Sequence, residues 1–323
     1  MTRPANAQVT RSRAIRGSSL LCLLILLLAG TAHATRAVLV VYDPESAAHR
    51  TIVDSLRNSD AVNSAGSRRA EIRELIVAEL DEDRLLETKA GLIITVGTRA
   101  AANLSKFSTD VPILNVFLPR AGYEQLYAKA TDTAAAIVLD QPIERQLALA
   151  RVLLPRAKRV GALVGASSGS DVEAMQQAVS LFALNLDVVR VTPEEHPVDA
   201  IERLLLANEM IITTFDREAY SPTTAKWLLY LAFQQRRPII GFSYALLKAG
   251  AVGAVFSTPE QIAKHTGELL DGWLSTGRLP AGPVFPRYYH IGLNAPVAEK
   301  LGLSPPSNDA IERQVHELLG DVR

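Results

Sequence analysis

Residues 91–100 read Gly-Leu-Ile-Ile-Thr-Val-Gly-Thr-Arg-Ala. The run from residue 92 to residue 96 is almost entirely apolar, which predicts a strand covered on both faces. The Gly97-Thr98-Arg99 turn follows it directly, as expected where a strand passes into a helix. This short unit therefore predicts a parallel sheet with helices packed on its faces.

The same pattern extends in both directions from this unit. Apolar runs in the first half lie at residues 37–42, 74–78, 91–96, 112–118 and 134–139. A second series lies at residues 159–164, 186–191, 210–214, 238–242 and 251–256. Between these runs, apolar residues recur every three or four positions, which indicates helices. Two comparable sets favour two sheets over one very wide sheet, so we predict an α/β protein with two Rossmann-like lobes of parallel sheets joined by a hinge.

The lobe boundaries follow from the helix signals. Thr258 and Pro259, with Gln261 three residues after Thr258, form a capping box that predicts a helix over residues 259–276. We expect this helix to return the chain to the first lobe, and we expect a late strand at residues 287–293. The first lobe is then residues 35–139 plus about 258–281, and the second is residues 140–257 plus about 282–323.

The first 34 residues have the pattern of a cleaved signal peptide. Arg3, Arg11, Arg13 and Arg16 precede an apolar run at residues 20–28, and Ala32-His33-Ala34 follows it. The run is about nine residues long, roughly half of what a bilayer span requires. We predict export to the periplasm with cleavage after Ala34. The alternative, an uncleaved anchor, would place the same domain outside the cytoplasm.

Composition excludes several classes of function. The single cysteine lies within the predicted signal peptide, so the mature chain would have no disulfide and no thiol chemistry. It would keep 30 basic and 34 acidic residues, a net charge of −4, without a basic run that could hold nucleic acid. The five mature histidines are scattered without metal-ligand spacing, and no dinucleotide or triphosphate motif is present, so we predict no metal and no cofactor.

The candidate site residues are those that follow the strands, because ligands bind beyond the carboxyl ends of parallel strands. They are Asp43, Thr98, Arg99, Arg120, Ser167, Ser168, Phe215, Asp216, Ser243 and Tyr244. Together they could seat a small polar zwitterion, with its carboxylate on Thr98 and backbone N–H groups and its ammonium on Asp216. Alternatively, Thr98 and Ser243 only cap helices, Asp43 belongs to a turn, and Arg99 and Arg120 are solvated surface charges.

One motif also admits a catalytic interpretation. Residues 165–169 read Gly-Ala-Ser-Ser-Gly and match the G-x-S-x-G nucleophile elbow between a strand and a helix. A serine hydrolase would use Ser167 as nucleophile, Asp216 to orient the base, and His265 or His290 as that base. Small polar residues after a strand are also an ordinary loop, and no glycine-rich oxyanion segment precedes them. We therefore predict that the protein is not an enzyme.

Four further segments carry a family resemblance. They are RQLALARVLLPRAKRVG at residues 145–161, RPIIGFS at 237–243, KAGAVG at 248–253 and NAPVAEKLGL at 294–303. In this order they resemble the ABC-transporter substrate-binding proteins that include the tryptophan- and tyrosine-binding lipoproteins. The resemblance covers about residues 90–306.

The resemblance implies the type I periplasmic binding protein fold and a monomer that traps a solute, possibly amino-acid-like, between its lobes. It also implies docking on the membrane permease of an ABC transporter, and it places Thr98 at a ligand carboxylate and Asp216 facing the solute. A ligand-sensing periplasmic receptor without transport is the alternative that the sequence leaves open.

Overall fold

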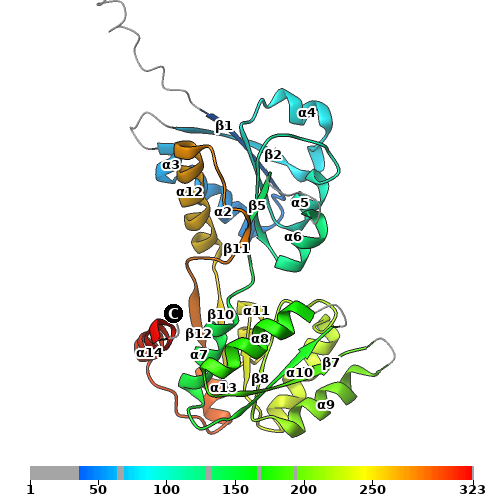
Figure 1. Cartoon of the computed structure of the whole chain (residues 1–323), viewed down its shortest axis with the longest axis vertical. Helices are drawn as coiled ribbons and strands as arrows, with labels where there is room; N and C mark the ends of the chain where they lie inside the picture. Colours follow the sequence, from blue (N-terminus) through cyan, green and yellow to red (C-terminus); the bar gives the residue numbers. More distant parts are fainter. Residues whose placement is uncertain (1–35, 64–68, 128–132, 166–168, 193–194, 322–323) are drawn as a thin grey trace, which may run out of the picture.

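The computed structural model describes residues 36–63, 69–127, 133–165, 169–192 and 195–321, which form two α/β lobes placed end to end (Figure 1). Each lobe is built on one six-stranded sheet, and the predicted two-lobed α/β fold is confirmed. Within these ranges no helix is both long enough and apolar enough to cross a bilayer. The predicted signal peptide, residues 1–34, lies outside the described residues.

The first sheet is entirely parallel and has the order β11-β5-β4-β3-β1-β2, which is a doubly wound arrangement. Its strands are β1 Arg36–Tyr42, β2 Ala70–Ile76, β3 Leu92–Val96, β4 Ile113–Leu118, β5 Ala134–Val138 and β11 Gly282–Val284. The helices of this lobe are α2 Ala47–Arg57, α3 Asp60–Asn63, α4 Glu82–Glu87, α5 Thr98–Leu104, α6 Arg120–Tyr127 and α12 Pro259–Thr276, with a 3-10 turn at Val77–Glu79. Helices α2 and α12 pack on one face of the sheet, and α5 and α6 pack on the other.

The second sheet repeats this order as β12-β10-β9-β8-β6-β7, and only the β10–β12 pair is antiparallel among its pairs. Its strands are β6 Arg159–Val164, β7 Asn185–Arg190, β8 Met210–Ile212, β9 Ile239–Gly241, β10 Gly253–Phe256 and β12 His290–Leu293. Its helices are α7 Ile143–Leu153, α8 Gly169–Leu181, α9 Pro197–Ala207, α10 Pro222–Gln234, α11 Tyr244–Ala249, α13 Ala295–Lys300 and α14 Asn308–Asp321. Helices α7, α8 and α14 cover one face, and α9, α10 and α11 cover the other.

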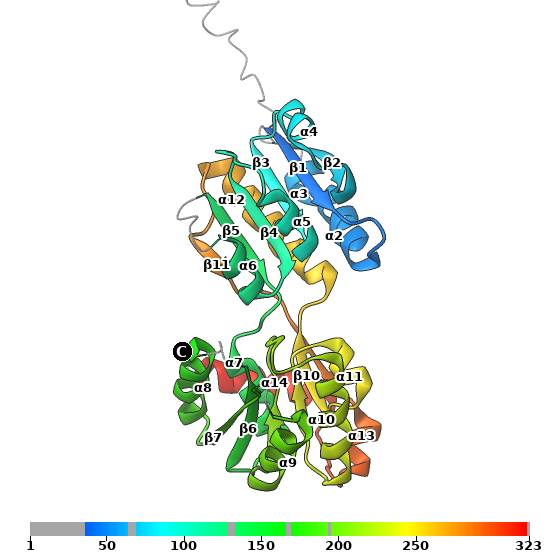
Figure 2. The ribbon, with the colours of Figure 1, turned by 90° about the vertical axis from the view of Figure 1, so that its right-hand side faces the viewer.

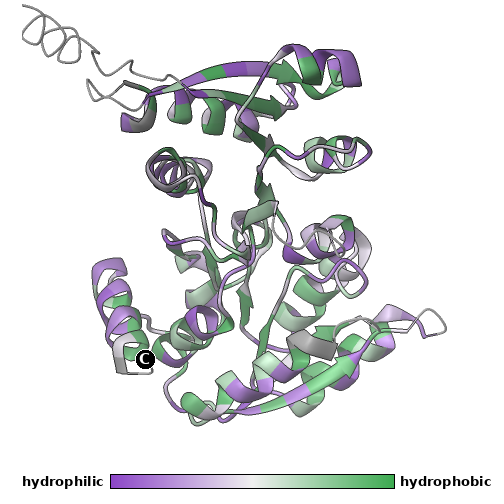
Figure 3. Ribbon diagram, turned by 45° about the horizontal axis from the view of Figure 1, so that its top comes forward, coloured by the Kyte–Doolittle hydropathy of each residue, from purple (hydrophilic) through white to green (hydrophobic). Residues whose placement is uncertain are grey.

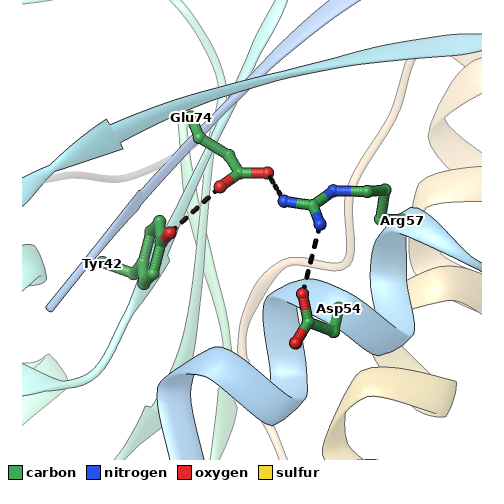
Figure 4. Close-up of polar contacts among 4 residues, drawn as sticks. All are labelled: Tyr42, Asp54, Arg57 and Glu74. Atoms are coloured by element: carbon green, nitrogen blue, oxygen red, sulfur yellow. Dashed lines mark hydrogen bonds and ion pairs between the residues drawn. The ribbon is translucent and has the colours of Figure 1, made fainter. Parts of the chain in front are cut away.

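The apolar strands lie between these helix layers, whose outward faces are hydrophilic (Figure 3). One polar cluster fastens α2 to the outer part of the first sheet. The Tyr42 hydroxyl donates to Glu74 at 3.0 Å, and Arg57 pairs with Glu74 and also with Asp54 at 3.2 Å (Figure 4). These groups are largely solvent-exposed, so we assign them a positioning role and little stabilisation.

One predicted strand is misplaced, and one strand is missed. The second strand spans Ala70–Ile76, whereas the sequence predicts residues 74–78, because this edge strand carries exposed charges and lacks a continuous apolar run. The short strand β11, which the sequence does not predict, pairs with β5 in the first sheet. The capping box and the helix Pro259–Thr276 form as predicted, and the helix packs in the first lobe.

Three chain segments connect the lobes, between β5 and α7, between β10 and α12, and between β11 and β12 (Figure 2). A buried hydrogen-bond network joins all three. The Gln141 amide donates to Ser257 Oγ at 2.9 Å, and Ser257 Oγ donates to the Tyr288 carbonyl at 2.6 Å. We call Gln141, Arg145, Ser257 and residues 286–288 the hinge network.

Arg145, on the first turn of α7, completes the hinge network. Its Nη1 donates to Gln141 Oε1 at 2.6 Å and to the Pro286 carbonyl at 2.9 Å, and its guanidinium lies 4.0 Å from the centre of the Tyr289 ring. Arg145 is buried, so its charge needs these partners to offset the loss of water. One side chain therefore couples the first and third connections.

Helix α12 holds the third connection as well. The Arg287 amide donates to His265 Nδ1 at 3.3 Å, the Arg287 guanidinium pairs with Glu268 at 2.5 Å, and the Tyr288 hydroxyl donates to Glu268. Burial of His265, and then the nearby positive charge of Arg287, lower the pKa of this histidine below its ordinary value of 6.5.

A pH dependence of stability follows from this histidine. As the pH falls below 6.5, the unfolded chain takes up a proton that folded His265 resists, so stability is lost between pH 6.5 and the lower folded-state pKa. We expect His265→Asn, whose oxygen can still accept from the Arg287 amide, to lose less stability than the unaltered protein between pH 7.5 and pH 5. Urea unfolding at both pH values measures this. The exposed His316→Asn should keep the full loss, and equal losses in both variants would contradict the assignment.

Gly97 offers a second test of the fold. It joins β3 to α5 with φ of 87°, and a Cβ at this position would lie 2.5 Å from Cε1 of His49. We expect Gly97→Ala to lower the free energy of unfolding by about 1–3 kcal/mol, since it adds both backbone strain and a clash. Gly272→Ala, in an open position on α12, should instead raise it by about 0.5–1 kcal/mol. Denaturant titration compares the two, and a loss confined to Gly272→Ala would contradict the strain and clash expected at residue 97.

Candidate functional site

The cavities between the lobes lie beyond the carboxyl ends of the strands in both sheets. One cavity of about 610 Å³, which we call the aromatic chamber, is lined by five aromatic rings. They belong to Phe117, Phe215, Phe242, Tyr244 and Phe256. A second cavity of about 670 Å³ and a third of about 210 Å³ share Arg120, Asp140 and Phe215, and we call these two together the polar channel. Phe215 borders all three cavities, so the chamber and the channel adjoin, and we call them together the cleft.

The first lobe supplies Phe117 to the chamber through an irregular strand. Phe117 lies in β4 with φ of 61°, and the pairing of β4 with β5 shifts register between Val116 and Leu118. A left-handed backbone is costly for an aromatic residue, and such strain concentrates at functional positions. The Phe117 ring contacts His49 edge-on at 5.7 Å between centroids. Burial lowers the pKa of His49, which favours the neutral imidazole beside the ring.

The second lobe supplies a pair of tilted rings in contact, from neighbouring strands. Phe215 follows β8 and Phe242 follows β9, and because β8 and β9 are paired, these two residues lie side by side. Their ring centroids are 4.1 Å apart. The Phe242 amide donates to Thr213 Oγ1 at 3.2 Å, which fixes the backbone under the pair. The pair is therefore a preformed apolar platform.

The remaining rings come from the start of α11 and the end of β10. Tyr244 is 57% exposed and lies 5.6 Å from Phe256, measured between ring centroids, and Phe256 lies 5.4 Å from His290. Ser243 lies next to Tyr244 and caps α11, where its Oγ accepts from the Leu246 amide at 3.3 Å. Glu260, on the first turn of α12, is exposed and also borders the chamber.

The structure divides the residues predicted from sequence among several places. Phe215, Ser243 and Tyr244 line the aromatic chamber, whereas Thr98, Arg120 and Asp216 line the polar channel. Asp43 and Arg99 form an ion pair at 2.9 Å, with the Arg99 side chain 61% exposed. A backbone amide and then Arg99 hold the pKa of Asp43 below its ordinary value. Ser167 and Ser168 lie outside the described residues.

The structure also bears on the alternative roles, as helix caps for Thr98 and Ser243 and as a surface charge for Arg120. Ser243 caps a helix as expected, but Thr98 does not, because Gly97 is the cap residue of α5 and makes no side-chain bond. Arg120 is half-buried, with its guanidinium 4.4 Å from the centre of the Phe285 ring and its amide donating to Asp140 at 2.7 Å. Its place in the channel is therefore fixed by residues of two connections between the lobes.

The Asp216 carboxylate accepts hydrogen bonds from the backbone of two loops. Its Oδ2 accepts from the Gly165 amide at 2.5 Å, and its Oδ1 accepts from the amides of Glu218 at 2.9 Å and Ala219 at 3.0 Å. The carboxylate thus ties the loop after β6 to the loop after β8. In the hydrolase interpretation Asp216 would orient a histidine and His265 would be one candidate base, but Asp216 binds these amides and His265 accepts from Arg287.

Removing the Asp216 carboxylate should destabilise the second lobe. We expect Asp216→Ala to lower the free energy of unfolding by about 1–2 kcal/mol, because three backbone amides lose their acceptor. Asp110→Ala, at an exposed loop position before β4, should change it by less than about 0.5 kcal/mol. Thermal and urea unfolding of both variants measures this. Equal stability of the two variants would show that these bonds contribute nothing.

Sequence reasoning missed Phe117, Phe242, Phe256 and Glu260. Phe242 and Phe256 close apolar runs and look like ordinary core residues, and Phe117 lies inside a predicted strand. The signal that could have found Phe242 and Phe256 is their position as the last apolar residue of a strand, at the edge where the cleft forms.

Comparison with known proteins agrees with this architecture. The family model described as ABC transporter substrate binding protein matches residues 37–282. No curated protein matches the sequence.

Among solved structures, the fold is similar to the ligand-free, open structure of a substrate binding protein with adhesive properties from Clostridium difficile. The TM-score is 0.65 at 17% identity, with 85% of this chain and 97% of that chain covered. It is also similar to an ABC domain in complex with L-Trp from Streptococcus pneumoniae, with a TM-score of 0.57 at 16% identity over 86% of this chain and 98% of that one. At these identities the likeness concerns the fold.

Proposed function

Because the chain belongs to the ABC transporter substrate binding protein family, we propose that it is the solute-binding component of an ABC-type uptake system. In this proposal the signal peptide is removed after Ala34, and the mature monomer works in the periplasm. Closure of the two lobes traps one molecule, and the closed form docks on a membrane permease. Trapping requires only that the solute makes better contacts in the closed form than in the open form.

The observation that carries the proposal is a chamber lined from both lobes. Phe117 and Glu260 belong to the first lobe, whereas Phe215, Phe242 and Tyr244 belong to the second. A solute between them would be held on opposite sides, so its binding would favour closure about the hinge network. The cavity volume of about 610 Å³ lies within the usual range of about 300–1,000 Å³ for small-molecule sites.

The lining also narrows the class of solute. The sequence predicts a small polar solute, with an amino acid as one possibility, but the rings favour a molecule with a flat apolar part that can stack on them. The similar structure from Streptococcus pneumoniae holds L-Trp, a ligand of this shape. We propose that a flat apolar ring occupies the chamber and that a neutral hydrogen-bonding group of the solute extends toward Thr98 in the channel.

A ligand series tests the proposal. Indole and indole derivatives should raise the melting temperature, whereas L-alanine and glucose should not. A ligand at one hundred times its Kd adds about 2.7 kcal/mol to the stability of the folded state. The absence of a shift with every indole compound would contradict an aromatic solute.

Phe215→Ala should weaken the binding of a responding indole compound at least about tenfold, since stacking and burial against one ring together contribute more than about 1.4 kcal/mol. Phe215 is only partly buried, so the fold should survive this change. Phe233→Ala removes a ring that is 45% exposed on α10, and it should leave the Kd unchanged. Calorimetric titration compares the three proteins. Equal binding by Phe215→Ala and the unaltered protein would remove the ring pair from the site.

A further inference from the structure

The charge of the cleft is unbalanced. Six carboxylates line the chamber and the channel, those of Glu124, Asp140, Glu144, Asp216, Glu218 and Glu260. Two guanidinium groups, of Arg120 and Arg217, line the same cavities. The low-dielectric walls of a cleft focus the negative electrostatic potential of these carboxylates into the space between them. The cleft therefore favours a positively charged solute.

The chamber itself has the same bias. Among the described residues that line it, Glu260 is the one with a carboxylate, and none is a lysine or an arginine. The faces of its rings carry the negative part of the aromatic quadrupole, which attracts ammonium and quaternary ammonium groups. Lys248 is one nearby cation, and its Nζ lies 5.7 Å from the centre of the Tyr244 ring, one turn along α11. A Lys248 ammonium would compete with a cationic solute for that ring.

Binding of an anionic group in the chamber is less favourable. The carboxylate of a bound amino acid would share the chamber with Glu260, and among the described lining residues no lysine or arginine could pair with it. Burying a carboxylate without a compensating partner is costly, and a like charge nearby adds to the cost. The chamber therefore discriminates between an amine and the corresponding amino acid.

We propose that the solute is an organic cation, a primary amine or quaternary ammonium compound with a flat apolar body, whose positive group lies near Glu260. This inference rests on the proposed function and specifies the charge of its solute. The rings hold the apolar body, and the carboxylates of the cleft stabilise the positive group.

Three compounds with the same ring test the charge. Tryptamine is a cation at pH 7.5, L-tryptophan is a zwitterion and indole-3-propionate is an anion. We expect calorimetric titration of the purified protein in 50 mM salt to give at least tenfold tighter binding of tryptamine than of L-tryptophan, with indole-3-propionate weakest. The advantage of tryptamine should shrink in 500 mM salt, because salt screens exposed charges such as Glu260.

The possible failures are distinguishable. Binding of L-tryptophan or indole-3-propionate as tight as that of tryptamine would overturn the charge inference and leave the aromatic site standing. Lack of binding by all three compounds and by neutral indole would overturn the aromatic site and the charge inference together.

Two variants test whether Glu260 and Lys248 determine the preference for tryptamine over L-tryptophan. Glu260→Gln should reduce the tryptamine-to-tryptophan ratio about fivefold and leave the binding of neutral indole unchanged, and Lys248→Gln should raise the ratio. Glu299→Gln, exposed on α13, is the matched control and should leave the ratio as it is. Unfolding curves that match the unaltered protein show that each variant is folded. An unchanged ratio in Glu260→Gln would overturn the role of Glu260.

Discussion

The buried guanidinium of Arg145 is the constraint on which the arrangement of the two lobes depends. A positive charge away from water must keep its hydrogen-bond partners, and here these are the Gln141 side chain and the Pro286 carbonyl, on two different connections. Ser257 brings in the remaining connection through Gln141 and Tyr288. A rigid-body rotation of the lobes that keeps this network intact is cheap, whereas a sliding motion would break it. In the proposed closure of the cleft, the network thus favours rotation of the lobes over sliding.

The cleft itself is a product of strand order. Both sheets follow the same doubly wound order, so the loops after their central strands emerge at one edge, and the lobes face each other at those edges. Short loops then decide which side chains meet. Pairing of β8 with β9 brings Phe215 against Phe242, and the irregular backbone of β4 adds Phe117 from the opposite lobe. The rings require no long loops, and the chamber is largely preformed.

Much of this architecture could be predicted from the sequence, and the exceptions have physical causes. Strands covered on both faces need continuous apolar runs, so most of them are visible, and the cap at Thr258 fixes the start of α12. Edge strands obey different rules, and β2 and β11 were accordingly misplaced or missed. The site was harder to predict. The left-handed backbone at Phe117 and the bond from the Gly165 amide to Asp216 arise from tertiary contacts that no local pattern encodes.

The chain crosses between the lobes three times, and this limits how proteolysis or recombination can separate them. Each lobe is assembled from separate stretches of sequence, since β11 joins the first sheet after the chain has already built most of the second. A protease that cuts one connection would leave two others and the buried bonds between them, so the halves would stay together. Exchange of one lobe between related genes would need three junctions at once. Because of this backbone path, we expect the two lobes to be inherited together.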